Sequence, residues 1–566
     1  MIAMQVLSAT EMQACDRLTT ERFGIPSLEL MRKASAAVAA FAREQFPQAR
    51  RVTVLCGRGN NGGDGMMAAR LLASTGLELT TLLLGEPEAL SGDAAVAWSE
   101  LADSADEAAE GQIHVIYETE DLAQHTDALE ADLIVDAVVG TGFKPPLKGL
   151  ALAALEWVKG SKAPILAVDL PSGWPADETG AMIVGPVFPA DAVITFTAPK
   201  PAHVFGQLTR RWDQPVVVAP IGSPEEAVAA SLNENHLRVS WTVSAMELVQ
   251  TPRAAMANKG SFGHVLVVGG TFGTAGGKAG APAMTALTAL RAGAGLVTAA
   301  VPAPALGIVA AVAPELMTWS LTANASGQIA AENLIPESLT ALTGGKTVLA
   351  IGPGMGQAPE TAIFLAGLLA TTGMPVVLDA DALNLLAADP ALLAKVVEQA
   401  RAGRTVVMTP HPGEMARLTG LTAEEVQRDR QWVARAFAQQ AGVTLVLKGA
   451  RTLIAHPDGR VAVNTTGNPG MAKGGSGDVL TGLVAGLLAQ YPTEPARAVE
   501  AAVYLHGLAA DLAVRKSDEH TLLATDSLPH LSQAFRFRNR GMNGYLWLQG
   551  LPAEALQAAT QDEAAL

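Results

Sequence analysis

The chain has only two cysteines, Cys15 and Cys56, among its 566 residues, and few aromatic (4%) or charged (17%) residues. Two cysteines cannot build a disulfide framework or a cysteine-rich metal site, so we expect a protein of a reducing compartment, the cytoplasm. The first residues lack the basic start and apolar run of a secretory signal. No run of 18 apolar residues occurs, so the sequence predicts no membrane-spanning helix.

Positive charge is also scarce, since 39 basic residues face 55 acidic ones and the formal net charge is −16. An acidic surface disfavours nucleic acids and anionic membranes as partners. Phosphate-bearing small molecules remain compatible with it, because a loop of backbone N–H groups can bind phosphate on an acidic protein. Apolar residues form 49% of the chain, enough for a large core, which excludes a disordered protein.

Short β-branched segments alternate with Ala- and Leu-rich helical segments, which predicts the α/β class with parallel sheets. The pattern starts twice, so we expect two three-layer αβα domains, at residues 1–235 and 236–540. From about Phe537 the pattern stops, and residues 541–566 are expected to be a loosely packed C-terminal extension of unknown role. The expected strands are Val52–Cys56, Thr80–Leu84, Ile113–Tyr117, Leu133–Val139, Ile165–Asp169 and Ala192–Thr197, then His264–Val268, Leu296–Ala300, Val348–Ile351, Val376–Asp379, Thr405–Thr409, Thr444–Lys448 and a hairpin of Arg451–Ala455 with Arg460–Asn464.

Three polar, glycine-containing loops follow expected strands of the first half: GRGNNGGDG at 57–65, DAVVGTGF at 136–143 and DLPSG at 169–173. The carboxyl ends of parallel strands meet at one edge of a sheet, where open α/β folds bind ligands, so we expect these loops to converge. The first loop contains G-x-G-x-x-G, but Glu86 lies about 30 positions beyond Gly57, too far for the dinucleotide-binding fingerprint. A tight turn with helix-capping Asn and Asp is the alternative interpretation.

The side chains of these loops suggest a cation site and acid–base groups as well as ligand binding. Asn61, Asp136 and Ser172 offer oxygen atoms and no soft ligand, a set that suits a hard cation rather than zinc or copper. Asp64 and Asp169 are candidate acid–base groups.

Together the three loops resemble the NAD(P)H-hydrate epimerase family, over about residues 8–225. The resemblance implies a Rossmann-like fold that interconverts the R and S epimers of hydrated NADH and NADPH. It implies a potassium ion bound by Asn61, Asp136 and Ser172, with Asp169 at the nicotinamide end as the proton-handling residue. The positions implied to hold the hydrated nucleotide are Asn60, Asn61, Gly62, Gly63, Asp64, Gly140, Thr141, Gly142, Phe143, Lys144, Pro145, Pro146 and Asp169.

The longest motif, TGNPGMAKGGSGDVLTG, spans residues 466–482. Its glycines at 474–477 would place backbone N–H groups at the start of the following helix, where a phosphate or a developing oxyanion is attracted. Asp478 would then lie in the first helical turn and could take a proton from a hydroxyl group that is being phosphorylated. The alternative is that Asp478 only complements the helix dipole.

This motif resembles the ribokinase superfamily and, more narrowly, the ADP-dependent NAD(P)H-hydrate dehydratase family, over residues 255–535. KGSFGHV at 259–265, GPGMG at 352–356, DADAL at 379–383, TPHPGE at 409–414 and LKGART at 447–452 stand in the expected order. The resemblance implies a ribokinase-like fold in which Asp478 deprotonates the hydroxyl of the hydrated ring, magnesium neutralises phosphate charge, and ADP becomes AMP and phosphate. The implied contacts are Ala281, Gly354, His411 and Asp478 for the hydrated nucleotide, and Lys448, Gly449, Ala450, Arg451, Thr452 and Gly477 for ADP.

Several of these residues also have a plain structural interpretation. His411 would be a satisfied turn histidine, and Lys448 a solvated lysine at a strand end. Asp379 and Asp381 are either helix caps or groups linked to magnesium.

The two resemblances predict a bifunctional metabolite-repair enzyme whose first domain converts the R hydrate to S and whose second consumes S. Its partners would be hydrated NADH, hydrated NADPH and ADP, and the family suggests a homo-oligomer. ADP and ATP present the same adenosine and phosphates to residues 448–452, so the residues alone do not separate them. The alternatives are a ribokinase-type small-molecule or vitamin kinase with an accessory nucleotide-binding domain, and a first domain that has become a non-enzymatic interaction module.

Overall fold

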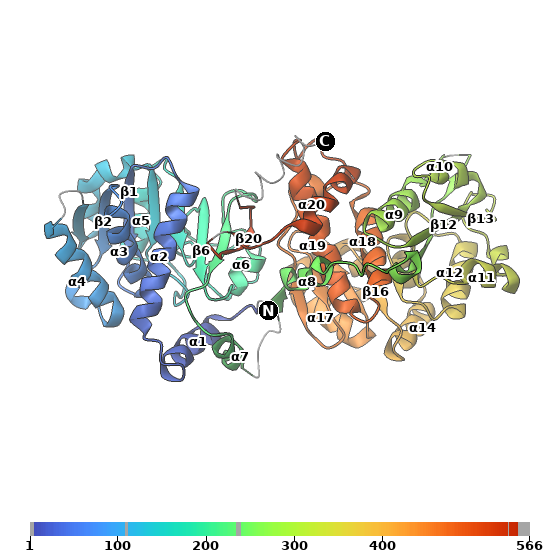
Figure 1. Ribbon diagram of the computed structural model, residues 1–566, viewed down its shortest axis with the longest axis horizontal. Coiled ribbons are helices and arrows are strands. Elements are labelled where there is room, and N and C mark those ends of the chain that lie inside the picture. Colours follow the sequence, from blue (N-terminus) through green and yellow to red (C-terminus); the bar gives the residue numbers. More distant parts are fainter. Residues whose placement is uncertain (1–4, 108–110, 234–238, 275, 542, 553–566) are drawn as a thin grey trace. The chain divides into compact units, whose positions relative to one another are not determined.

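The computed structural model describes residues 5–107, 111–233, 239–274, 276–541 and 543–552. The chain divides into two compact units: the first contains residues 2–236 with 538–566, and the second contains residues 237–537. Each unit consists of helices packed on a mainly parallel sheet, which confirms the predicted α/β class (Figure 1). Within the described ranges, no helix is both long and apolar enough to cross a membrane.

The first unit is built on an eight-stranded sheet in the order β20-β7-β6-β5-β4-β1-β2-β3. All neighbouring strands are parallel except β20, which is antiparallel to β7. The strands are β1 Arg51–Cys56, β2 Glu78–Leu84, β3 Gly111–Ile116, β4 Leu133–Ala137, β5 Ile165–Val168, β6 Ala192–Phe196, β7 Val216–Ala219 and β20 Leu546–Gln549. The helices are α1 Ala9–Glu21, α2 Ser27–Gln45, α3 Asn60–Ala73, α4 Gly92–Glu107, α5 Leu150–Val158, α6 Pro201–Phe205 and α7 Glu225–Ser231, with 3-10 turns η1 Pro87–Ala89 and η2 Thr119–Glu130.

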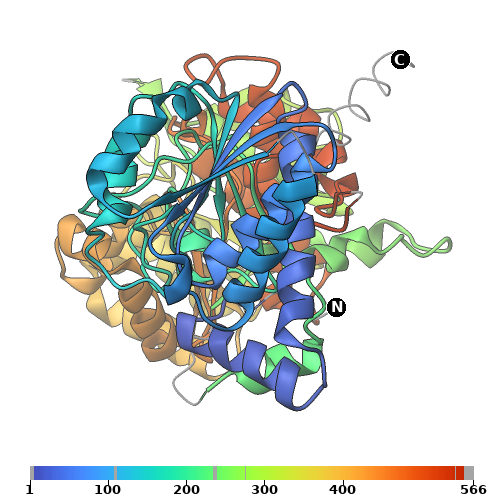
Figure 2. The ribbon, with the colours of Figure 1, turned by 90° about the vertical axis from the view of Figure 1, so that its left-hand side faces the viewer.

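Both faces of this sheet are covered by helices, which gives the three predicted layers (Figure 2). Successive side chains of a strand point to opposite faces. On β1, Val54 joins a buried cluster with Met31 of α2 and Leu72 of α3, whereas its neighbour Leu55 joins a second cluster with Leu155 of α5. The helices cover the two faces of the sheet, whereas the three loops follow β1, β4 and β5 at its carboxyl edge.

The C-terminal segment returns to the first unit instead of forming a separate extension. β20 pairs antiparallel with β7, with Leu546 opposite Val218, and the Gln549 side chain donates to the Thr209 hydroxyl at 2.7 Å. The expectation of a loosely packed extension is therefore wrong for residues 543–552, while residues 553–566 lie outside the described part. A four-residue strand has almost no periodicity of its own, so only its pairing with β7 reveals it.

We expect Trp547→Leu to lower the free energy of unfolding of the first unit by about 2 kcal/mol. Trp547 is buried and lies edge-on against Phe41 of α2, with ring centroids 6.3 Å apart, so the smaller side chain leaves a cavity. Hydrogen exchange of the β6 and β7 amides in increasing urea measures the effect. Tyr117→Leu, at an exposed aromatic of the same unit, is the control and should change little; an equal effect of both would contradict a structural role for the returning segment.

The second unit contains a ten-stranded sheet in the order β13-β12-β9-β14-β15-β16-β17-β18-β19-β8, and a separate two-stranded ribbon. Only the pairs β17–β18 and β18–β19 of the large sheet are antiparallel. The strands are β8 Val239–Trp241, β9 His264–Val268, β10 Phe272–Gly273, β11 Gly276–Gly277, β12 Leu296–Pro302, β13 Met317–Leu321, β14 Val348–Ile351, β15 Val376–Leu378, β16 Val406–Met408, β17 Thr444–Leu447, β18 Leu453–Ala455 and β19 Val461–Val463.

The helices of the second unit flank this sheet, and α18 and α19 are buried over much of their length. The α-helices are α8 Met246–Gln250, α9 Gly280–Arg291, α10 Leu306–Ala310, α11 Pro336–Thr343, α12 Pro359–Thr371, α13 Asp381–Ala388, α14 Pro390–Arg401, α15 Pro412–Thr419, α16 Ala423–Arg428, α17 Arg430–Ala441, α18 Ser476–Gln490, α19 Pro495–Val514 and α20 Leu531–Arg536. The 3-10 turns are η3 Thr242–Ala245, η4 Lys259–Phe262, η5 Ala303–Ala305, η6 Ala331–Leu334, η7 Pro469–Met471 and η8 Ala524–His530.

Every expected strand overlaps a strand of the structure, and the predicted β18–β19 hairpin is confirmed by its antiparallel pairing. The missed strands are short and lie mainly at sheet edges. β8, for example, has three residues and pairs with β19, and it is held there by the buried Trp241, whose indole nitrogen donates to the Thr465 hydroxyl at 2.8 Å.

Candidate active sites

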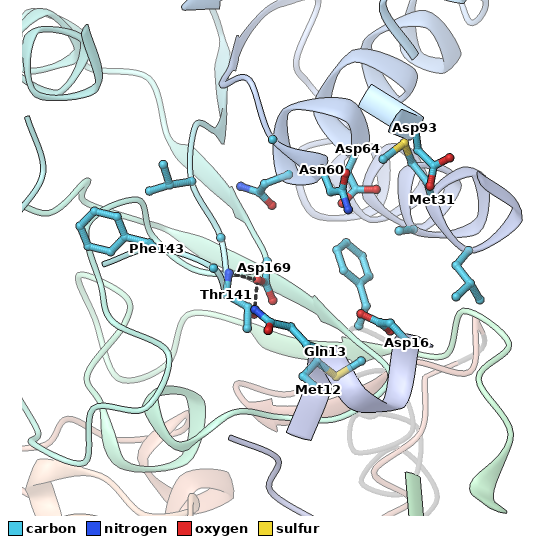
Figure 3. A pocket seen from close by; sticks show the side chains of 18 of the residues that line it. Met12, Gln13, Asp16, Met31, Asn60, Asp64, Asp93, Thr141, Phe143 and Asp169 are labelled. Atoms are coloured by element: carbon cyan, nitrogen blue, oxygen red, sulfur yellow. Dashed lines mark hydrogen bonds between the residues drawn. The ribbon is translucent and has the colours of Figure 1, made fainter. Parts of the chain in front are cut away.

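The first unit has a pocket of about 620 Å³ at the carboxyl ends of β1, β4 and β5 (Figure 3). The three loops converge there, as the sequence predicts. α3 begins with Gly59 as its N-cap and has no side-chain cap, so the alternative of a helix-capping Asn or Asp at its start is wrong. The predicted residues that line the pocket are Asn60, Asn61, Asp64, Gly140, Thr141, Gly142, Phe143 and Asp169.

Asp169 is held more tightly than a free acid–base group would be. One carboxylate oxygen accepts hydrogen bonds from the backbone N–H of Thr141 (2.7 Å) and its hydroxyl (2.6 Å). The other accepts from the Thr195 hydroxyl (2.8 Å) and the Lys200 ammonium (2.9 Å). Burial alone would raise the pKa of Asp169, but the Lys200 charge and these hydrogen bonds hold it well below its usual range. Asp169 is thus a fixed anion.

Lys200 and Gly140 explain how this carboxylate is enclosed. The Lys200 side chain is 3% exposed. It follows β6 in a segment without a recognisable motif, so its role cannot be predicted from the sequence. A Cβ atom on Gly140 would lie 2.8 Å from Asp169 Oδ2 and 3.1 Å from Asn61 Oδ1. Only glycine therefore lets the 140–143 loop approach both side chains.

The residues expected to hold a cation lie partly beneath this pocket. Asp136 is completely buried and accepts from the Ser172 hydroxyl (2.6 Å), the Ser172 backbone N–H (2.8 Å) and the Val138 N–H (3.2 Å). Burial raises the pKa of Asp136 to about 6, against the lowering effect of these bonds. The side-chain nitrogen of Asn61 is buried without a hydrogen-bond partner among the described residues. An unpartnered buried amide beside an oxygen-rich corner fits a bound ligand or hard cation.

Five predicted binding residues do not line the pocket. Gly62 and Gly63 are buried and pack against the Gly57 backbone and the Met31 side chain. Their role in the structure is close helix packing. Lys144, Pro145 and Pro146 are exposed outside the lining.

In the second unit, α18 begins just before Asp478, as the motif predicts. Its N-cap is Gly475, with a φ of +99° that favours glycine, and no side chain caps the helix. The first-turn N–H groups are therefore left for an anion. Burial, followed by the charge of Asp379, raises the pKa of Asp478 to about 7. A carboxylate with this pKa is well matched to take a proton near neutral pH.

Asp379 links the end of β15 to this helix and to Lys448. Its two oxygens accept from the Lys448 ammonium (2.8 Å) and the Thr481 hydroxyl of α18 (2.7 Å). Lys448 also lies 3.8 Å from Glu414, and although burial favours its neutral form, the two carboxylates raise its pKa. A Cβ on Gly477 would lie 3.3 Å from the Lys448 nitrogen. Lys448 is therefore a largely enclosed cation at the N-terminus of α18, with its side chain 19% exposed, and its interpretation as a solvated lysine is wrong.

Asp381 holds a loop rather than capping α13. Its oxygens accept from the Gly356 N–H (3.0 Å), the Gln357 amide (2.9 Å) and the Lys278 ammonium (3.3 Å), and no side-chain cap is present on α13. The same corner brings predicted residues together, since a Cβ on Gly354 would lie 2.8 Å from the Lys278 Cβ and 3.2 Å from that of Ala281.

His411 has the structural role that its alternative interpretation gives it. Its Nδ1 accepts from the N–H groups of Gly413 (3.0 Å) and Glu414 (3.3 Å) and so caps α15. Burial and the nearby Lys448 lower the pKa of His411, which favours the neutral ring. Because Nδ1 accepts two N–H groups, the proton of that ring is on Nε2. Its Nε2 lies 3.5 Å from Glu414 Oε1, and about half of the side chain is exposed, so the ring can still contact a ligand.

Two supporting residues were missed by the sequence analysis. Arg430 of α17 donates to the Ala450 carbonyl (2.5 Å) and the Leu447 carbonyl (3.2 Å), which fixes the predicted nucleotide loop at 448–452. Asp511 of α19 accepts from the Gly467 N–H (2.8 Å) and the Asn468 amide (2.9 Å), which fixes the segment before the glycine run. The signal that could have identified Asp511 is a carboxylate within the apolar second half of α19.

Comparison with known proteins assigns both halves. Residues 265–533 match the family described as NAD(P)H-hydrate dehydratase, and residues 27–202 match the family described as YjeF-related protein N-terminus. The bifunctional NAD(P)H-hydrate repair enzyme Nnr of Moorella thermoacetica is 41% identical over 94% of this chain and 97% of its own length. The chain belongs to this family. The Escherichia coli member is 36% identical over 92% of this chain and 91% of its own length.

Among solved structures, the ADP/ATP-dependent NAD(P)H-hydrate dehydratase of Bacillus subtilis, co-crystallised with ATP and magnesium, is 33% identical. It covers 51% of this chain and 96% of its own length, with a TM-score of 0.42. The two family matches fall one in each unit: residues 27–202 include Asp64, Asp136 and Asp169 of the first site, and residues 265–533 include Asp478 of the second.

Proposed function

We propose that this chain repairs hydrated NADH and NADPH in two steps. The first unit interconverts the R and S epimers, and the second unit dehydrates the S form with ADP, giving AMP and phosphate. The observation that carries the proposal is Asp478, a carboxylate with a pKa of about 7 in the first turn of an uncapped helix. Family membership over nearly the whole chain supports both steps.

In the second site, Asp478 takes the proton of the ring hydroxyl while the oxygen of that hydroxyl attacks the terminal phosphorus of ADP. The bond from that phosphorus to AMP breaks, and the α18 N–H groups with Lys448 stabilise the charge of the transferred group. Phosphate then leaves the ring carbon and a ring proton is lost, which restores the dihydropyridine. Ala281, Gly354 and His411 are the proposed contacts of the hydrated ring, and Lys448–Thr452 with Gly477 those of ADP.

Magnesium would reach this site with the nucleotide. In the described part of the chain, no group of three His, Cys, Asp or Glu side chains could hold a metal by itself. Magnesium usually binds to phosphates and one or two carboxylates, which fits this arrangement, with Asp379 and Asp381 as the protein contacts. When bound, it would neutralise phosphate charge during transfer.

In the first site, the pocket would hold the hydrated nucleotide against the start of α3 and the 140–143 loop. Epimerisation at the carbinolamine carbon requires loss of water or ring opening, followed by addition on the opposite face. Asn61, Asp136 and Ser172 would bind potassium, whose charge would stabilise an anionic group of the substrate. Asp169, paired with Lys200, keeps the Thr141 loop in place.

Asp136→Asn should reduce the dependence of epimerisation on potassium and lower its rate in potassium buffer about tenfold, because a neutral amide binds a hard cation less tightly. The rate is measured on the R epimer in potassium and in tetramethylammonium chloride. The wild-type rate should fall when potassium is replaced by tetramethylammonium, and the variant's rate should not. If both responded equally, these oxygens would not be the potassium site. Dehydration of the S epimer serves as the internal control.

The dehydration step is tested with purified S-hydrated NADH and ADP, by the return of dihydronicotinamide absorbance and the release of AMP. A ribokinase-type kinase would instead leave a stable phosphorylated product and restore no absorbance. Parallel reactions with ADP and ATP settle the choice of nucleotide. The cytoplasmic location and the homo-oligomer remain predictions.

A further inference from the structure

The first pocket contains carboxylates that its mechanism has not used. Asp16 of α1 and Asp64 of α3 both line it, and within the described residues neither carboxylate makes a hydrogen bond or ion pair. This contrasts with Asp169, whose two oxygens accept four hydrogen bonds. A group that gives and takes protons needs a free oxygen facing the substrate, and Asp16 and Asp64 have one.

Asp16 is held firmly although its carboxylate is free. α1 begins with a capping box in which Ser8 accepts from the Glu11 N–H while the Glu11 side chain accepts from the Ser8 N–H. Its inner face packs Met12 and Cys15 in a buried cluster with Ala198. The side chain of Asp16 is exposed and opens to the pocket. Figure 3 shows Asp16 and Asp64 on different walls of the pocket, with Asp169 at the sheet edge.

We infer that Asp16 is a catalytic acid–base residue of the epimerase site and works with Asp64 across the pocket, while Asp169 remains a fixed anion. The inference rests on the proposed epimerase function. Two carboxyl groups on different walls suit this reaction, because water leaves one face of the ring and adds to the other.

The proton balance closes between these two groups. As the C–O bond breaks, its electron pair stays on oxygen, which takes a proton from the protonated carboxyl group and leaves as water. The lone pair of the ring nitrogen forms a C=N bond. Water then forms a new C–O bond on the opposite face, the C=N pair returns to nitrogen, and the ionised carboxylate takes the surplus proton. The two groups exchange roles, and the reverse reaction or exchange with solvent restores them.

The electrostatics favour different protonation states for the two groups. Burial, with the charges of Asp169 and Asp16, raises the pKa of Asp64 well above its usual range, which favours its protonated form. Asp16 is solvent-accessible, but the pocket walls withhold part of its solvent, and this desolvation raises its pKa to about 6; the Lys200 charge lowers that pKa and the Asp169 charge raises it. Cys15 adjoins Asp16, and Asp93 and Arg58 line the same pocket. Asp16 is therefore ionised at pH 7, and epimerisation should decline as the pH falls below about 6.

The test uses the full chain with R-enriched hydrated NADH, potassium and no ADP, and follows the two epimers by chromatography after subtraction of the uncatalysed rate. Asp16→Asn should lower kcat/KM about 100-fold and abolish the acidic limb near pH 6. Asp16→Glu should retain part of the rate and keep that limb. Glu21→Gln, an exposed carboxylate at the end of the same helix and outside the pocket lining, should behave as wild type.

Unchanged hydrogen exchange of the β1 and β4 amides shows that the variant's first unit is folded. An Asp16→Asn chain with the wild-type rate, or with a lower rate but the acidic limb intact, would overturn the assignment of Asp16 alone. A wild-type chain that does not accelerate epimerisation would overturn the proposed function of the first unit and this role with it.

Discussion

Asp478→Asn should reduce ADP-dependent dehydration by at least about 1000-fold, which is within the range that general base catalysis contributes. The amide keeps the shape of the side chain but cannot take the hydroxyl proton. In wild type, the pKa of about 7 predicts that kcat/KM for dehydration rises with pH up to about 7 and then levels. One unit below that pKa, about one tenth of Asp478 is ionised, so the rate should fall about tenfold.

Asp478→Asn should lower the rate of dehydration without lowering the free energy of unfolding. The pKa of Asp478 is raised in the folded protein, so ionising it costs folding free energy as the pH rises from about 4 through 7. Asp478→Asn removes that cost, and the variant should be no less stable than wild type at pH 8. Epimerisation of the R hydrate by the same chain should be unchanged. A variant that still dehydrates at the wild-type rate would show that another group is the base.

Asp169→Asn should abolish epimerisation, with a loss of at least about 100-fold, and leave dehydration unchanged. It removes the charge partner of Lys200, whose side chain is 3% exposed. Breaking a buried ion pair on one side costs about 3 kcal/mol, because the remaining charge stays buried. The amide has one acceptor oxygen instead of two, so it cannot accept from Thr141 on one side and from Thr195 and Lys200 on the other. Initial rates on separated epimers measure both activities.

The double variant Asp169→Asn/Lys200→Met separates stability from function. With both charges removed, the unit should regain most of the lost stability, because no uncompensated ammonium remains. Epimerisation should stay low, because the fixed negative charge is still missing from the pocket. If the double variant regained activity together with stability, Asp169 would have no role in the site beyond neutralising Lys200.

Functional residues that lie within one contiguous motif can be predicted from the sequence, whereas residues that reach a site only through packing cannot. The glycine run before Asp478 and the loops after β1, β4 and β5 contain their own chemistry, so the two sites are readable from contiguous residues. Lys200, Arg430 and Asp511 act on loops far away in the sequence, and their neighbours form no motif. Asp16 was missed for the same reason, since only the packing of α1 brings its carboxylate to the pocket.

Side-chain geometry also corrected roles that residue type suggested. Asp169 has the chemistry of a base, but four donors occupy its oxygens and the Lys200 charge lowers its pKa, so it accepts a proton poorly. Lys448 follows a strand like many solvated lysines, yet its ammonium lies between the carboxylates of Asp379 and Glu414. β20 was not predicted because a four-residue strand shows almost no periodicity and because its partner β7 lies in the other half of the chain.

The most direct test of the central claim uses a mixture of R- and S-hydrated NADH with excess ADP, magnesium and potassium. Dihydronicotinamide absorbance should return completely, with the R fraction recovered faster than it epimerises spontaneously. Recovery of the S fraction alone at a catalysed rate would contradict epimerisation by the first unit. An absence of any ADP-linked recovery would contradict the account of the second.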